Sequence, residues 1–335
     1  MTRAARTLVR SSYRGPFMRG PLRRALSGTV TVLLYHRIAE HHDAPWLEAS
    51  GLPCTSPKAF REHLQLLTEL GAEFLTLDEL DPQVKNGLEK RKSHSVARPR
   101  VVITFDDGFA DNFEVAAPML EEFQARGVFF ITTSLPDKAV LLDHRLAWLN
   151  ASEDGQRCLW QALEDRLRPV PIPVAGPLWA ARQLLSPAEI ETIVIEAERR
   201  IGPLQREQIC PLYATWDQIA IAAKRGHQIG AHTVHHPMRY SLSAAEFTTE
   251  LVESKQSLEA HLGCDIRAFS YPFNAYMFTD EAICRAAGFR QIATVDPGRL
   301  NYTGTLGKIP RRTAFCIHDS LSRFRELLLD QGFTE

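Results

Sequence analysis

The 335-residue chain has no paired cysteine motif, no long apolar run and no excess charge of either sign. Its six cysteines stand apart without C-x-x-C spacing, which argues against structural zinc and a disulfide framework and favours reduced thiols in a cytoplasm. No stretch approaches the roughly 20 apolar residues that span a bilayer. The net charge of −1 gives no reason to expect nucleic acid as a partner. What remains is a globular protein, 44% hydrophobic and 24% charged, with enough apolar residues for a sizeable core.

The N-terminal segment is basic. Seven arginines fall within residues 3–24, and the first acidic residue is Glu40. A secretory signal requires an apolar segment after its basic residues, and no such segment follows these arginines. We therefore expect residues 1–28 to be a disordered leader and the protein to be cytoplasmic and bacterial. Weak peripheral contact with anionic lipid and an Arg-rich transit peptide are the alternatives.

From residue 29 onward, strand-like and helix-like segments alternate. Such alternation predicts a parallel sheet with helices outside. Seven or eight strand units favour a barrel over an open sheet. The expected strands cover 29–35, 74–77, 101–105, 128–132, 227–231, 268–271, 291–294 and 307–310, and the expected helices between and after them cover 56–70, 111–126, 215–225, 243–262, 279–287 and 319–330.

Residues 137–212 interrupt this alternation. They contain helical stretches at 144–150, 156–167 and 187–201 around a proline-rich segment, Pro169–Pro173. We expect an inserted helical cap after a strand, which is where barrel enzymes carry their functional loops. The predicted organisation is a leader followed by one domain over 29–335 that contains the cap.

Two short segments carry the residue types of a hydrolytic metal site. An apolar strand ends in Asp106 and Asp107, and a second strand-like stretch is followed by two imidazoles four residues apart, His232 and His236. One Asp and two His can hold a divalent metal with coordination positions left open. The spare Asp is what a metal-assisted hydrolase needs as a base. Taken singly, an exposed Asp-Gly turn and ordinary core or surface histidines are the alternatives.

These segments also resemble a known family. Thr104–Gly108 (TFDDG) and His232–Pro237 (HTVHHP) are similar to the first two motifs of the polysaccharide deacetylases, the NodB-like enzymes of carbohydrate esterase family four. Phe269–Phe273 (FSYPF) resembles the third motif. Leu34–His36 (LYH) resembles the last motif in the branch where that motif has moved to the N-terminus. The resemblance covers about 29–330 and implies a distorted (β/α)7-type barrel, the NodB-homology fold, with a helical insertion.

The resemblance implies a role for each motif residue. Asp107, His232 and His236 would bind one divalent metal, Zn²⁺ in the first place, with Co²⁺, Ni²⁺ or Mn²⁺ as alternatives. Asp106 would be the catalytic base. His235 is left out of the ligand set, because adjacent residues of an extended segment point in opposite directions.

The resemblance also implies an acid and an oxyanion donor. His36 would protonate the leaving nitrogen, and His318 competes for this role from the place that the motif occupies in unpermuted relatives. The backbone N–H of Phe273 would stabilise the tetrahedral oxyanion. A backbone donor does not depend on the side chain, so Phe in place of Tyr is harmless.

The chain departs from the family pattern at two positions. Ser270 stands where many relatives have the arginine that holds the base, and Asn274 stands where a glycine is usual. Arg311 is the candidate substitute for that arginine as partner of Asp106, with an ordinary surface charge as the equal alternative. Asn adopts positive φ more readily than most residues, so we expect the turn to survive.

We therefore expect a metal-dependent hydrolase that removes an N-acetyl group from an amino sugar in a glycan or glycan precursor and releases acetate. Deformylation, O-acetyl ester hydrolysis and a non-catalytic glycan-binding descendant of the fold are the alternatives. The expected partner is a carbohydrate or amino sugar. Four aromatic residues are candidate walls for a sugar ring, although aromatic residues in such positions more often pack in the core. These are Phe109, Trp148, Tyr271 and Tyr276.

Overall fold

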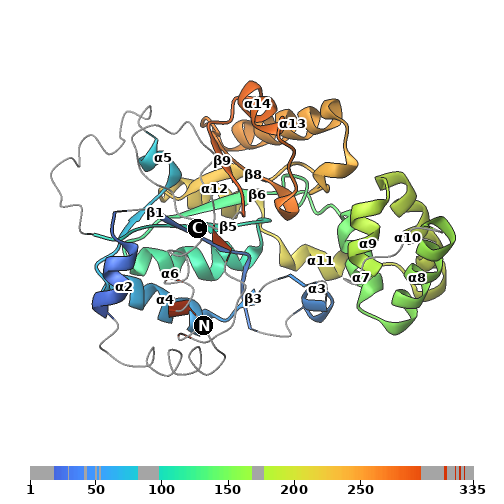
Figure 1. The fold of residues 1–335 in the computed structure, drawn as a ribbon, viewed down its shortest axis with the longest axis horizontal. Helices are drawn as coiled ribbons and strands as arrows, with labels where there is room; N and C mark the ends of the chain where they lie inside the picture. Colours follow the sequence, from blue (N-terminus) through green and yellow to red (C-terminus); the bar gives the residue numbers. More distant parts are fainter. Residues whose placement is uncertain are drawn as a thin grey trace, which may run out of the picture.

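A parallel sheet forms the centre of the protein, as seen in a computed structural model (Figure 1). Its strand order is β10-β1-β5-β6-β7-β8-β9, and β4 also pairs with β5. Every strand pair of this sheet is parallel, which confirms the predicted α/β class. The structure describes residues 19–28, 30–40, 44–49, 51–52, 54–81, 98–167, 177–295, 313–314, 321, 324–325 and 328.

The strands are continuous apolar runs because helices cover the sheet. All six residues of β1 are buried, and so are five of the six in β5. Burial on both faces is typical of parallel sheets. The strands are β1 (Val30–Tyr35), β4 (Glu73–Leu75), β5 (Arg100–Phe105), β6 (Gly127–Ile131), β7 (Gln228–Ala231), β8 (Ala268–Ser270), β9 (Gln291–Ala293) and β10 (Thr313–Ala314), and a separate pair is β2 (Arg37–Ile38) with β3 (Cys54–Thr55).

Helices begin where the sequence offers a capping side chain. Ser56, Thr215 and Ser243 each accept a hydrogen bond from the backbone three residues later. No helix among the described residues is long and apolar enough to cross a membrane. The helices of the barrel are α2 (Arg19–Leu26), α3 (Pro45–Ala49), α4 (Pro57–Glu69), α5 (Leu77–Leu80), η3 (Asn112–Ala116), α6 (Ala117–Glu122), α12 (Trp216–Lys224), η5 (Arg239–Ser241), α13 (Ala244–Leu262), η6 (Pro272–Asn274) and α14 (Asp280–Ala286).

Part of the segment predicted as a disordered leader is helical. Helix α2 buries Leu22 and Leu26 in the main core, so the prediction of disorder is wrong for this part of residues 1–28. The density of arginine there suggested a solvated chain, but two leucines four residues apart give one helix face an apolar edge. The strand expected at 307–310 lies outside the described residues, whereas Thr313 and Ala314 pair with β1.

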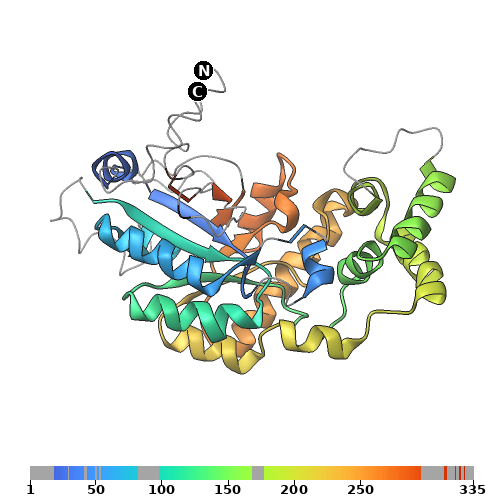
Figure 2. The same ribbon diagram turned by 90° about the horizontal axis from the view of Figure 1, so that it is seen from below.

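The described residues between 137 and 212 are mainly helical, and their helices lie at one end of the molecule, on the right in Figures 1 and 2. These helices share a small core of their own that includes Leu146, Leu149 and Leu159. A second apolar cluster, including Trp46, Phe109 and Tyr213, joins it to the barrel. We call this segment the cap. Its helices are α7 (Leu142–Asn150), α8 (Glu153–Leu167), α9 (Pro177–Leu184), α10 (Pro187–Ile201), α11 (Arg206–Ile209) and η4 (Cys210–Leu212).

A buried ion pair ties η5 to α14. Both side chains are nearly inaccessible, and Arg239 donates to both carboxylate oxygens of Asp280 at 2.8 and 2.9 Å. Replacing Arg239 with Met would leave that carboxylate buried without its cation. We expect the free energy of unfolding to fall by about 3–5 kcal/mol, measured by urea denaturation. Arg61→Met, which breaks an exposed pair with Glu122, should leave the free energy of unfolding nearly unchanged. Equal losses in the two variants would contradict the prediction.

Candidate active site

The predicted site residues follow neighbouring strands of the sheet. His36 comes directly after β1, and Asp106 directly after β5, which pairs with β1 so that Tyr35 lies beside Phe105. The backbone N–H of Asp106 donates to the Tyr35 carbonyl at 3.1 Å. His232 follows β7 in the same way. Because all these strands are parallel, their carboxyl ends meet at one edge of the sheet, where such folds place their ligands.

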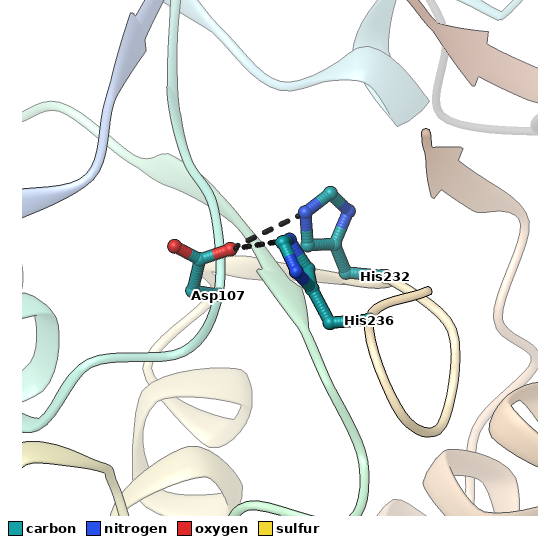
Figure 3. A group of neighbouring side chains, drawn as sticks. All are labelled: Asp107, His232 and His236. Atoms are coloured by element: carbon teal, nitrogen blue, oxygen red, sulfur yellow. Dashed lines mark ion pairs between the residues drawn. The ribbon is translucent and has the colours of Figure 1, made fainter. Parts of the chain in front are cut away.

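Three of these side chains converge on one point (Figure 3). Oδ1 of Asp107 lies 3.3 Å from Nε2 of His232 and 3.2 Å from Nε2 of His236. All three ligand atoms lie within 4.8 Å of one another. Asp107 and His232 are buried, and His236 is partly buried. The structure thus brings together the three residues that the sequence analysis assigned to a metal.

The hydrogen bonds around the three side chains fit a cation. Nδ1 of His232 lies 2.7 Å from the Ser270 carbonyl, which can only accept, so this nitrogen carries the proton. In the neutral imidazole, the form that binds a metal, Nε2 then carries the lone pair and faces the carboxylate. Oδ1 of Asp107 is buried and has no hydrogen-bond partner among the described residues. Two electron-rich atoms held 3.3 Å apart in this way suit a divalent ion between them.

The backbone around the candidate ligands is strained. Asp107 and His236 have φ values of 74° and 55°, and Thr233 has 65°. Non-glycine residues with positive φ cluster at functional sites, where the surroundings enforce them. Here Thr233 Oγ1 accepts a hydrogen bond from the His236 N–H at 3.0 Å, which closes the turn between the two imidazoles. The adjacent Gly108, at φ 86°, continues the turn with no side chain to strain.

The predicted base has a partner that the sequence analysis did not assign. Asp106 is buried, and Ser270 Oγ donates to its Oδ2 at 3.4 Å. Oδ2 also lies 3.9 Å from Nε2 of His232. Ser270, at the place of the family's arginine, therefore contacts the base through its hydroxyl and a candidate ligand through its carbonyl. Arg311 and His318 lie outside the described residues.

The predicted acid is held by the same segment that carries the two aspartates. Asn112 Nδ2 donates to the carbonyl of His36 at 2.6 Å. Asp111 forms a buried pair with Arg37 at 3.0 Å and accepts from the N–H of Ile38 at 2.9 Å. The segment after β1 is thereby fixed to the segment after β5, which brings His36 to the edge of the sheet where Asp106 lies.

The charges of the site are coupled. Burial works against ionisation of Asp107, yet His232 and His236 hold its pKa well below the usual value. The charge of His36 acts in the same direction. Burial likewise opposes the charge of His236, but the Asp107 carboxylate raises its pKa. A negative ligand and basic imidazoles are what a divalent cation requires.

Phe273 lies on the next strand end, in η6 after β8. Its backbone is left-handed, at φ 56° and ψ 12°, and its ring meets the His236 ring edge-on at 4.6 Å between centroids. Asn274 also has positive φ, at 55°, and its side-chain oxygen accepts from the N–H of Val295 at 2.7 Å. The turn expected at this position is therefore present with Asn in place of Gly.

His235 and the four candidate aromatic residues lie in different surroundings. His235 points to α13, where its Nδ1 lies 2.7 Å from Glu250 Oε1. Of the candidate aromatic walls, Phe109 and Tyr271 are each only 1% exposed and pack in the core, because each follows a buried strand. Trp148 and Tyr276 are partly buried against apolar clusters.

Two charged residues of the cap were missed. Arg182 of α9 lies over the Phe273 ring, and Asp143 of α7 pairs with Arg182. No sequence signal marks them, because they lie far from both motifs and on an insertion whose docking depends on tertiary packing. The cap's position after β6, at the carboxyl edge of the sheet, is the one indication that its residues reach the site.

A buried histidine of the cap predicts a pH-dependent stability. His144 Nε2 lies 2.7 Å from the Tyr213 hydroxyl, and burial lowers the pKa of His144 to about 4 against the opposing charge of Asp143. In the unfolded chain His144 binds a proton near pH 6.5, whereas in the folded protein it does so only near pH 4. The stability that the neutral side chain contributes is therefore complete above pH 6.5 and is lost as the pH falls toward 4. We expect wild type to lose about 2 kcal/mol between pH 7 and pH 5 through this group.

The measurement is urea unfolding at the two pH values for wild type and His144→Gln. Glutamine keeps a hydrogen-bonding group beside Tyr213 but does not titrate, so the variant should show a loss about 2 kcal/mol smaller than wild type. An identical pH dependence in both proteins would show that His144 is not the titrating group.

Comparison with known proteins gives one family match. The sequence profile of the polysaccharide deacetylases matches residues 93–292, which include both aspartates after β5 and both candidate histidine ligands. His36 lies before the matched range. A search of curated proteins finds no match.

Solved structures with the same fold are distant in sequence. The deacetylase PplD of Streptococcus pyogenes, in complex with acetate, gives a TM-score of 0.57 at 19% identity, over 92% of this chain and 100% of that one. A de-N-acetylase from Aggregatibacter actinomycetemcomitans gives 0.55 at 14% identity, over 89% and 99%. IcaB from Ammonifex degensii gives 0.52 at 18%, over 90% and 97%. These likenesses confirm the predicted NodB-homology barrel.

Proposed function

The chain belongs to the polysaccharide deacetylase family, and from this membership we propose that it removes an N-acetyl group from an amino sugar in a metal-dependent hydrolysis. The family makes it a carbohydrate deacetylase, a hydrolase acting on carbon–nitrogen bonds other than peptide bonds. The observation that carries the proposal is the convergence of Asp107, His232 and His236 beside a second buried carboxylate, Asp106. A glycan or a glycan precursor is the proposed substrate.

Asp107, His232 and His236 are the proposed ligands of one divalent metal. The metal supplies Lewis acidity, which makes a water molecule more acidic and polarises a carbonyl group. One carboxylate and two imidazoles match the three-ligand sets of catalytic zinc, so Zn²⁺ is the proposed ion. Co²⁺, Ni²⁺ and Mn²⁺ accept the same donor types.

The proposed proton acceptor is Asp106. Its Oδ2 lies 3.9 Å from Nε2 of His232, so a water molecule beside the ligand set is within its reach. Ser270 Oγ donates to the same oxygen and orients the carboxylate. The water would lose its proton to Asp106 as its oxygen attacks the acetamide carbon.

Two further groups would complete the reaction. The backbone N–H of Phe273 would donate to the oxyanion that develops on the acetyl oxygen, and its left-handed conformation beside His236 supports this role. His36 would give a proton to the departing nitrogen. Acetate and the free amine of the sugar are the products.

We further propose a reducing compartment such as the bacterial cytoplasm. The cysteines that the structure describes, Cys54, Cys158, Cys264 and Cys284, are all free. Free thiols are typical of proteins that are not exposed to oxidising conditions.

The direct test is acetate release from N-acetylated monosaccharides, sugar nucleotides and oligomers, with and without a chelator. We expect release from at least one class, its loss with chelator and its return with Zn²⁺. Formate release from N-formyl sugars, or acetate release from O-acetyl esters alone, would replace the N-acetyl assignment. Release that persists in metal-free protein would contradict metal dependence.

A further inference from the structure

The cap inserts a charged pair beside the proposed metal ligands. Arg182 of α9 donates from Nε and Nη2 to the two carboxylate oxygens of Asp143 in α7, at 2.6 and 2.7 Å. The side chains are only 10% and 22% exposed. The charge of His236 is among those that lower the pKa of Asp143 against the effect of burial, so the pair lies within electrostatic reach of that imidazole.

A chain of ring contacts leads from this pair to the metal site. The Arg182 guanidinium lies over the Phe273 ring, 4.8 Å from its centroid. The same ring contacts the imidazole of His236 edge-on, with 4.6 Å between the ring centroids. The Phe273 side chain therefore touches one residue from the cap and one proposed ligand. A cation held over an aromatic face is attracted to it, and more strongly when both are shielded from water.

Phe273 needs such support because its backbone is unfavourable. A bulky side chain at φ 56° is uncommon and persists only where contacts enforce it. The turn itself is closed by the Ala275 N–H donating to Pro272 O at 3.0 Å. That bond also bears on the Phe273 N–H, because Pro272 O and this N–H belong to one planar peptide unit. Contacts of the ring help to hold Phe273 in the left-handed conformation on which this turn depends.

We propose that Arg182, oriented by Asp143, is a positioning residue that holds the Phe273 ring and so aims the Phe273 N–H at the developing oxyanion. This inference rests on the proposed function, in which that N–H is the oxyanion donor. It makes the cap a working part of the site, since α9 supplies the contact and α7 its counter-charge. The barrel alone would then have the metal ligands and the base but a poorly aimed donor.

Two other roles for Arg182 fit the contacts less well. An anion-binding arginine would need a free guanidinium edge toward the substrate, but Asp143 takes two of its donors and neutralises its charge. A purely structural pair exists elsewhere in the cap, where Arg145 bridges Glu191 and Glu198 of α10 at 2.6–2.9 Å. Arg182 differs in that it also reaches a barrel residue.

The test compares Arg182→Met, Arg182→Lys and Arg145→Met in steady-state kinetics on the substrate found above. We expect Arg182→Met to lower kcat about 10- to 100-fold with little change in KM, since an oxyanion donor acts in the transition state and misplacement is costly. Lysine keeps the charge but not the planar fork, so it should restore activity only in part. Arg145→Met should lower stability while leaving kcat within about twofold of wild type.

A double-mutant cycle with Phe273→Ala decides whether Arg182 acts through the ring. Alanine keeps the backbone N–H but removes the ring, so the double variant should be no slower than the slower single variant. Losses that multiply, or a raised KM with unchanged kcat in Arg182→Met, would overturn the inference. An inactive wild type would instead refute the proposed function, and an active wild type with an inactive Asp106→Asn variant would uphold that function whatever Arg182 does.

Discussion

Replacing Asp107 with asparagine is expected to abolish both metal binding and acetate release. Asparagine keeps the shape of the side chain but not the negative charge that faces His232 and His236 at 3.3 and 3.2 Å. Changes to residues that merely orient ligands already cost 10- to 100-fold in metal affinity, so loss of the only charged ligand should cost more. Activity should fall to that of chelator-treated wild type.

Metal binding can be measured without the reaction. A ligand that binds only the folded state stabilises it by about 2.7 kcal/mol at 100 times its Kd, so Zn²⁺ should raise the melting temperature of metal-free wild type. Asp107→Asn should show no such rise, although it folds well, because the change removes a buried charge. Asp154→Asn is the matched control, since its carboxylate is 72% exposed on the cap. A full zinc-induced shift in Asp107→Asn would show that the metal lies elsewhere.

The convergence of the proposed metal ligands could be predicted from sequence, because the strand ends largely determine where these side chains lie. Asp107 and His232 each follow a buried parallel strand, and β6 alone lies between β5 and β7. Both therefore emerge at one edge of the sheet, whatever the details of packing. The same logic applies to His36, which the sequence analysis assigned through the family resemblance, because it follows β1 and β1 pairs with β5.

Residues whose place depends on side-chain packing were not predictable in this way. Ser270 was read as the loss of an arginine, whereas its hydroxyl and its carbonyl contact Asp106 and His232. That reading could not be better without the register of β7 against β8, where Ala231 pairs with Phe269. The hydrophobic period and the residue spacing of a sequence indicate which residues lie near one another along a strand. They do not give the distances between side chains on neighbouring strands.

The cap shows the limit most clearly. Its helices follow from sequence periodicity, but the contact of Arg182 with Phe273 depends on how the cap docks. Docking rests on a shared apolar cluster that includes Trp46, Phe109 and Tyr213, from three separate segments. Phe109 was a candidate sugar wall with core packing as the more common role, and the structure uses it for this packing, stacked on Tyr213 at 4.7 Å.

Asp106→Asn is expected to keep the metal and lose the reaction. Asparagine still accepts the hydrogen bond from Ser270 Oγ, so the site should keep its shape. It cannot take a proton from the attacking water. Loss of general-base catalysis should lower kcat about 10²- to 10⁴-fold, measured as acetate release under saturating substrate. The zinc-induced rise in melting temperature should match that of wild type.

The contrast between the two adjacent aspartates is the strongest part of this test. Both are buried and both lie near Nε2 of His232, at 3.9 Å for Asp106 and 3.3 Å for Asp107. Asp107 also lies 3.2 Å from Nε2 of His236. The same one-atom change at neighbouring positions should therefore separate proton transfer from metal binding. If Asp106→Asn also loses the zinc-induced shift, Asp106 is a ligand and the base must be sought in another group; if it keeps full activity, Asp106 is not the base.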